Sequence, residues 1–121
     1  MAVREVMNQN KNVAIAYAYY TTMAEKNSEL VEKYLHPDIQ LIGPYGQKAG
    51  KEAVFEAAKK FMHMFKSIKI HSQCGSDDHV AISYDLLEFG DSGAAQRAAS
   101  LMTFKDGLII KNELFFDTRS L

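Results

Sequence analysis

The chain has 121 residues, of which 24% are charged and 47% hydrophobic, and its formal net charge is −1. A chain of this length fits one domain, spanning residues 1–121, whose core needs neither a disulfide nor a metal ion. The charged residues are scattered along the chain and form no basic cluster, so we expect no nucleic-acid partner.

Helices are predicted in the first half of the chain. Residues 3–26 carry apolar side chains over a wide arc, with Tyr17 and Tyr20 on one side. A short helix is expected over residues 28–35, with Asn27 as its N-cap and a proline just beyond its end. Apolar residues between positions 53 and 65 then recur at i, i+1, i+4 and i+5, which indicates a third helix with one buried face.

The other segments alternate with a period of two and are predicted to be strands. Residues 39–42 read as a short strand that ends in a turn at 43–46, and residues 46–52 are also interpreted as a turn. Further strands, joined by turns, are expected over residues 68–73, 79–89, 94–105 and 108–117. Long strands in succession make an antiparallel meander, and helices followed by strands indicate an α+β layer architecture.

The later strands carry apolar residues on both faces, such as Val80 and Ile82 on one and Ala81 and Leu87 on the other. The helices can cover only one face, so a second subunit is the simplest cover for the other. We therefore predict a homodimer formed through the outer face of the sheet.

Cys74 is the only cysteine, which excludes an internal disulfide and suits a reducing compartment. His71 and Cys74 would point to opposite sides of one strand, and the sequence has neither a His-x-His nor a Cys-x-x-Cys pair. We expect no metal and no other cofactor. No stretch approaches the roughly 20 apolar residues of a membrane-spanning helix, and the first residues lack an apolar signal core. The expected location is the cytoplasm, without a membrane partner.

Several segments occur in an order and spacing that characterise one large superfamily: 19–27 (YYTTMAEKN), 34–38 (YLHPD), 43–46 (GPYG), 50–54 (GKEAV) and the closing 107–117. Over nearly its whole length the chain resembles the nuclear transport factor 2-like superfamily, in the branch of ketosteroid isomerase and the SnoaL-like polyketide cyclases. The resemblance implies a cone-shaped, cystatin-like fold, with N-terminal helices packed on a curved antiparallel sheet around an apolar pocket. It implies no single activity, because the superfamily includes enzymes, binding proteins and assembly domains.

In the isomerase branch, a tyrosine on the first helix and a protonated aspartate stabilise the developing oxyanion, and a carboxylate before a proline is the base. The resemblance places this tyrosine at Tyr19 and the second acid near Ser100. It places the base at Gly43, directly before Pro44. Glycine cannot accept a proton, so the isomerase mechanism is not expected in this chain.

Tyr19 and Asn112 are polar residues that the resemblance places inside the pocket, and Ile110 is placed inside with Asn112 on the last strand. A buried phenol or amide can orient a ligand, but the same two side chains can also bond to each other and serve only the structure. The predicted ligand contacts are Tyr19, Leu41, Tyr45, Phe61, Ser100, Met102, Asn112, Leu114 and Phe116.

Asp85 lies mid-strand in a segment with apolar residues on both faces, and two placements stay open. If Ser83, Asp85 and Leu87 line the cone, Asp85 is a desolvated carboxylate with a raised pKa and a candidate general base. If Tyr84 and Leu86 line it instead, Asp85 lies on the outer face or at a subunit contact. Tyr19 and Asp85 are accordingly the candidate catalytic residues.

Two functions follow from these observations. The first is a pocket for a small apolar molecule, with acid–base chemistry of an isomerase, cyclase, dehydratase or hydrolase. The alternative is a non-catalytic homodimeric binding or assembly module of the same fold. They differ in one requirement, because an acid–base enzyme needs a proton acceptor inside its pocket and a binding protein does not.

Overall fold

The computed structural model describes residues 3–44 and 46–117 and confirms the α+β fold. Its elements in chain order are α1 (Val3–Ala24), α2 (Ser28–Lys33), β1 (Leu35–Gly43), β2 (Gly46–Ala49), α3 (Lys51–Met62), β3 (Ser67–Ser76), β4 (His79–Phe89), β5 (Ala94–Lys105) and β6 (Leu108–Phe116). Asn27 caps α2 as predicted, because its side chain accepts a hydrogen bond from the Leu30 amide.

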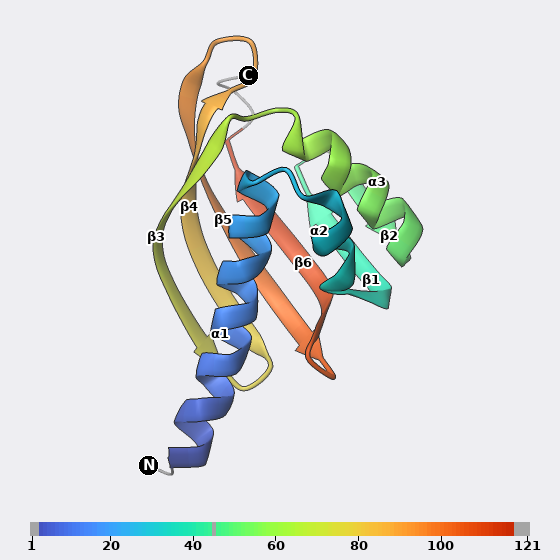
Figure 1. Ribbon diagram of the computed structural model, residues 1–121, viewed down its shortest axis with the longest axis vertical. Coiled ribbons are helices and arrows are strands. Elements are labelled where there is room, and N and C mark those ends of the chain that lie inside the picture. The colour runs from blue at the N-terminus through green and yellow to red at the C-terminus, as the bar shows by residue number, and fades with distance from the viewer. Residues whose placement is uncertain (1–2, 45, 118–121) are drawn as a thin grey trace.

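Within the described residues, the strands form one six-stranded sheet in the order β2-β1-β6-β5-β4-β3. Strands β4 to β6 pair as the predicted antiparallel meander, and β3 extends it by pairing antiparallel with β4. Strand β1 runs parallel to β6 and antiparallel to β2. Figure 1 shows that the sheet is curved and that the described helices lie on the same face of it. The concave interior between helices and sheet is therefore where a pocket can form.

Strand β2 was not expected, so the interpretation of residues 46–52 as a turn is wrong for its first part. Residues Gly46–Ala49 pair with the end of β1, from Gln40↔Ala49 to Gly43↔Gly46. All of them are exposed, and the sequence GQKA has neither alternation nor a β-branched residue. This strand is formed by backbone pairing with β1, which a side-chain pattern does not reveal.

The buried face of α1 is set by helical spacing. Ala16, Tyr19, Tyr20 and Met23 follow one another at i, i+3, i+4 and i+7, and all are buried. Tyr17 was expected on the buried side and is instead 49% exposed. It follows Ala16 directly, and one step along a helix turns a side chain by about 100°.

Strand β4 alternates between the two faces of the sheet. Val80, Ile82, Tyr84 and Leu86 are buried on the side of the helices, and the residues between them lie on the outer face. This alternation decides the placement of Asp85.

Strand β6 contains an irregularity that changes which residues face inward. Its register with β5 shifts between the pairs Thr103↔Lys111 and Phe104↔Ile109, which leaves Ile110 as an extra residue. Ile109 is therefore the core residue, only 1% exposed, and Ile110 is outside the pocket lining. The prediction that Ile110 faces the pocket is wrong.

Lys26 ties the end of α1 to the end of α3. Its ammonium donates to the main-chain oxygens of Met62 and Phe65, with a distance of 2.6 Å to the oxygen of Phe65. It also lies 3.8 Å from the centre of the Phe65 ring, and partial burial lowers the pKa of Lys26. These contacts satisfy the carbonyl group of the last residue of α3 and one that lies just beyond the helix, and they hold α3 over β1 and β2.

Candidate ligand-binding pocket

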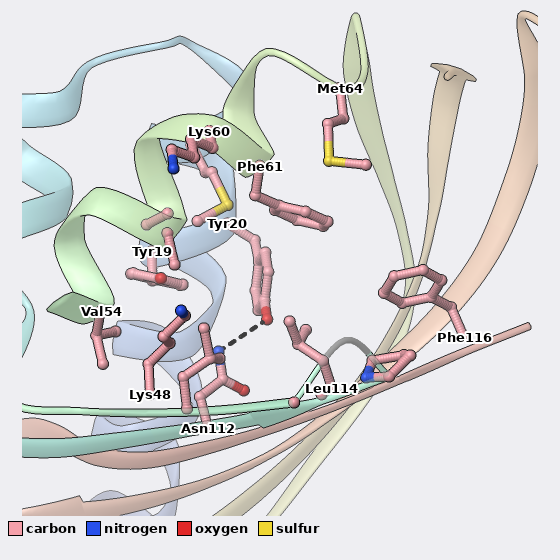
Figure 2. A pocket seen from close by; sticks show the side chains of 17 residues that line it. Tyr19, Tyr20, Lys48, Val54, Lys60, Phe61, Met64, Asn112, Leu114 and Phe116 are labelled. Atoms are coloured by element: carbon pink, nitrogen blue, oxygen red, sulfur yellow. Dashed lines mark hydrogen bonds between the residues drawn. The ribbon is translucent and has the colours of Figure 1, made fainter. Parts of the chain in front are cut away.

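A cavity of about 260 Å³ lies between α1, α3 and the strands β1, β2 and β6 (Figure 2). Its wall is largely apolar, with the helices on one side and the sheet on the other. The lining residues are Tyr19, Tyr20, Met23, Leu41, Gly43, Pro44, Gly46, Lys48, Val54, Ala57, Ala58, Lys60, Phe61, Met64, Asn112, Leu114 and Phe116.

Small residues keep this space open. Ala57 and Ala58 of α3 and Gly43 of β1 all belong to the lining. A Cβ atom at Gly43 would meet the Cβ of Leu114 at 3.6 Å, which is an ordinary contact, and the backbone there has no positive φ. Gly43 is therefore not demanded by the backbone, and the missing side chain leaves room in the cavity.

Three hydroxyl groups form a buried ring of hydrogen bonds beside the cavity. The Tyr84 hydroxyl donates to the Tyr20 hydroxyl at 3.2 Å and lies 2.8 Å from Ser100 Oγ, and Tyr20 is also bonded to Ser100. Each hydroxyl has one proton, so the ring runs in one direction, from Tyr84 to Tyr20, from Tyr20 to Ser100 and from Ser100 to Tyr84. Burial raises the pKa of Tyr20 and of Tyr84, so both remain neutral.

Asn112 connects this ring to the floor of the cavity. Its Nδ2 donates to the Tyr20 hydroxyl at 3.3 Å (Figure 2). This bond agrees with the direction of the ring, in which Tyr20 gives its one proton to Ser100 and accepts from Asn112. The Oδ1 of Asn112 is buried and has no hydrogen-bond partner among the residues described. One acceptor at the pocket floor is thus unsatisfied.

Tyr19 also lines the cavity but stands outside the hydrogen-bonded ring. It is 3% exposed, it packs edge-on against Tyr20 and Tyr34, and its hydroxyl has no hydrogen-bond partner in the described part of the chain. Burial raises the pKa of Tyr19. Tyr19 lines the cavity as the resemblance predicted, and its neighbour Tyr20 makes the contact with Ser100. Asn112 likewise bonds to Tyr20 and not to Tyr19.

The other predicted ligand contacts separate into those at the cavity and those behind it. Leu41, Phe61, Leu114 and Phe116 join Tyr19 and Asn112 in the lining. Ser100 and Met102 are 2% and 0% exposed and do not line the cavity, so their prediction as ligand contacts is wrong. Ser100 is covered by the two tyrosines that bond to it, and Met102 is enclosed in the core. Tyr45 lies outside the described residues.

Asp85 lies on the outer face of the sheet, as the second of its two placements expected. The carboxylate is bonded to Arg97 Nε at 2.6 Å and to His71 Nε2 at 2.8 Å, on the neighbouring strands. The Arg97 guanidinium, and after it His71, hold the pKa of Asp85 below its usual value. An ionised carboxylate on the far side of the sheet cannot reach a ligand in the cavity. The prediction of Asp85 as a catalytic base is wrong.

The sequence pattern of the SnoaL-like domain matches residues 16–112, which is most of the chain. The chain belongs to the SnoaL-like domain family. This confirms the resemblance to the nuclear transport factor 2-like superfamily. Among curated proteins, none matches this SnoaL-like chain significantly.

Solved structures share the fold at low sequence identity. A Kribbella flavida protein, whose name gives it as a candidate ketosteroid isomerase, has a TM-score of 0.80 and 16% identity over 91% of this chain and 80% of its own. A Jannaschia protein named as a candidate SnoaL-like polyketide cyclase has a TM-score of 0.80 and 16% identity, covering 93% and 89%. A de novo designed protein with a curved β-sheet reaches 0.78 at 17% identity, covering 98% and 90%. At such identities the likeness shows the fold alone.

Among the polar residues at this SnoaL-like pocket or directly behind it, Tyr20, Tyr84, Lys48 and Lys60 were not predicted as site residues. The spacing of both tyrosines indicates that they are buried. Tyr20 follows Ala16 by four positions on α1, and Tyr84 has the same two-residue spacing as the apolar Val80, Ile82 and Leu86 on β4. Lys48 and Lys60 also line the cavity. Lys48 is on the unpredicted strand β2, and Lys60 belongs to the face of α3 that was taken as solvent-exposed.

The lining residues that the structure describes include no aspartate, glutamate or histidine. Over the described ranges, no three or more His, Cys, Asp or Glu side chains come together as a group that could hold a metal ion. Nor does any described helix have both the length and the apolar character needed to cross a membrane.

Proposed function

We propose that this SnoaL-like chain binds one small, mostly apolar molecule in the cavity between α1, α3 and β6. The observation that carries the proposal is an apolar cavity of about 260 Å³ with an unsatisfied amide oxygen at its floor. Apolar cavities of about 150 Å³ hold benzene, and pockets for drug-sized ligands begin at about 300 Å³. The expected ligand is larger than a single ring and similar in size to two fused rings.

Asn112 favours a ligand that carries a hydrogen-bond donor. A buried acceptor without a partner costs roughly 1–3 kcal/mol, which a ligand hydroxyl or N–H that reaches Oδ1 would restore. The amide is already held in place through its Nδ2, so little orientational freedom is lost when a ligand binds. We therefore expect the donor of the ligand to point toward the floor of the pocket.

The lining gives no support to acid–base catalysis. A general base has to lie within hydrogen-bonding reach of the proton that it removes, and the described lining has no carboxylate or imidazole. Gly43 occupies the position that the isomerase resemblance gives to the base. Structural neighbours are named as isomerase and cyclase candidates, but for this chain we propose binding without that chemistry.

A fluorescence titration with 2-naphthol tests the proposal. The chain has no tryptophan, so the probe can be excited without background from the protein. We expect a dissociation constant on the order of 0.1 mM, from about 0.5 kcal/mol for each non-hydrogen atom of the probe. Gly43→Val fills part of the cavity and should weaken binding about tenfold.

The matched control is Ala95→Val, at an exposed position of β5, which should bind 2-naphthol like the parent chain. Equal affinity of the parent chain and the Gly43→Val variant would show that the probe binds elsewhere. Absence of binding at millimolar 2-naphthol would count against the proposal itself.

We further propose that the chain forms a homodimer through the outer face of the sheet. No helix within the described residues covers this face (Figure 1). It carries the small residues Ala81 and Ala99, and Phe115 on its β6 portion is 55% exposed. A second copy would remove this aromatic side chain from water.

A cytoplasmic location, which the single cysteine favours, stays a prediction.

A further inference from the structure

We infer that the ligand of this pocket is an amphipathic anion, with an apolar two-ring body, a carboxylate at one end and a hydrogen-bond donor at the other. In this arrangement Lys48 and Lys60 bind the carboxylate at the mouth, and Asn112 accepts from the donor at the floor. The inference rests on the proposed function and adds the chemical class of the ligand.

The first observation is an imbalance of charge at the pocket. Lys48 and Lys60 both belong to its lining, and the described lining contains no carboxylate. Neither lysine forms an ion pair with any residue that the structure describes, whereas the adjacent Lys59 pairs with Glu56 at 2.7 Å. Two positive charges without counter-charges therefore border an apolar cavity, and an anion is the species that they attract.

The second observation is the position of Lys48 relative to Asn112. Leu41 of β1 pairs with Lys48 of β2 on one side and with Asn112 of β6 on the other. The three residues form one cross-strand row on the cavity side of the sheet. Adjacent strands lie about 4.8 Å apart, so the Cα atoms of Lys48 and Asn112 are roughly 10 Å apart. A two-ring molecule along this row can reach from the mouth to the floor.

Figure 2 shows how the two lysines approach from different elements. Lys48 rises from the sheet, Lys60 comes from α3, and both lie toward the same side of the cavity as Tyr19. Both lysines are exposed, whereas Asn112 is 4% exposed. A carboxylate between the lysines can keep part of its hydration while the apolar body of the ligand loses contact with water.

The same lysines could also serve only to cover the mouth with their apolar stems, and the two roles have different consequences. Methionine keeps an apolar stem of similar length and removes the charge. If the lysines act through their charge, a change from Lys to Met weakens the binding of an anion and leaves the binding of a neutral molecule unchanged.

The test compares three probes by fluorescence titration of the intact chain. They are 6-hydroxy-2-naphthoate, its neutral methyl ester, and 2-naphthol, which lacks the carboxylate group altogether. We expect the carboxylate to bind about tenfold more tightly than the ester, and Lys48→Met and Lys60→Met each to weaken it about threefold. The affinity of the carboxylate should fall as salt is added, and that of the ester should not.

Lys105→Met is the matched control, because it removes the same charge at an exposed end of β5 and should leave all three affinities unchanged. Unchanged 2-naphthol affinity in the Lys48 and Lys60 variants shows that they are folded. If 2-naphthol binds but the carboxylate binds no more tightly than the ester, the ligand class is wrong and the proposed function stands. If none of the probes binds, both fail.

Discussion

Replacing Asn112 should change ligand affinity more than it changes the stability of the fold. Its Nδ2 is bonded to Tyr20, and its Oδ1 has no partner among the described side chains and main-chain groups. Tyr20 keeps its bonds to Ser100 and Tyr84 without Asn112. The amide is therefore dispensable for the ring of hydroxyls, and its free acceptor is the group to which we propose that a ligand donates.

We expect Asn112→Leu to weaken 2-naphthol about fivefold while changing the free energy of unfolding by less than about 1 kcal/mol. Leucine is similar in shape, and its substitution removes the unsatisfied acceptor along with the donor. Urea unfolding and probe titration measure the two effects separately. The control probe is 2-methoxynaphthalene, which has no donor and should bind both proteins equally. A large loss of stability with unchanged 2-naphthol affinity would assign Asn112 to the structure alone.

For single residues, the sequence predicted which positions lie at the cavity more accurately than it predicted the contacts of their side chains. Asn112 and Gly43 lie at the cavity, where the resemblance to the isomerase branch places them. Tyr20, which bonds to Ser100, was not predicted as a site residue, although its neighbour Tyr19 was. Neighbouring residues on a helix differ by about 100° in direction, so the hydroxyls of Tyr19 and Tyr20 have different surroundings.

The strands show both the strength and the limit of alternation as a guide to structure. Strands β4 and β5 were predicted with their observed bounds, because turn residues flank both of them, but the sequence left open which face of β4 is buried. The short, fully exposed β2 and the register shift near Ile110 depend on backbone pairing, which leaves no periodic trace. Lys48 was not predicted as a site residue because it lies on β2.

On the outer face of the meander, Asp85 of β4 binds His71 of β3 and Arg97 of β5 and so links three strands. The pKa of Asp85 is lower in the folded chain than in the unfolded one. The folded state therefore binds this proton less readily. The contribution of Asp85 to stability is fully present above the unfolded pKa of about 3.9 and is lost as the pH falls from there through the lower folded pKa.

Asp85→Asn is accordingly expected to destabilise the chain at pH 7 and to have a smaller effect at pH 3. Urea unfolding at both pH values, at one protein concentration, measures the difference. Asp91→Asn, at an exposed turn position, is the control and should change little at either pH. An equal loss at pH 7 and pH 3 for Asp85→Asn would exclude its charge as the cause.

For the whole molecule, the helices cover one face of the sheet and form the pocket there, while the described helices leave the opposite face open (Figure 1). The sequence predicted this layer arrangement, because helices precede a meander with apolar residues on both faces. The resemblance also predicted an apolar pocket but not its volume, which depends on how Ala57, Ala58 and Gly43 meet in three dimensions.

Dimerisation stays a prediction at this scale. Sedimentation velocity at micromolar concentration should give a species of twice the chain mass of 13.6 kDa. Phe115→Lys should shift it toward the monomer, because a charge would be buried at the contact. A species of one chain mass for the parent protein would contradict the prediction, whatever the variant does.

The central claim is that the cavity receives a small apolar molecule. A crystal structure of the chain with 2-naphthol tests it most directly. The account predicts density for the naphthalene ring between α3 and β6, with the hydroxyl within hydrogen-bonding distance of Asn112 Oδ1. A cavity filled by its own side chains, or 2-naphthol bound only elsewhere on the surface, would contradict it.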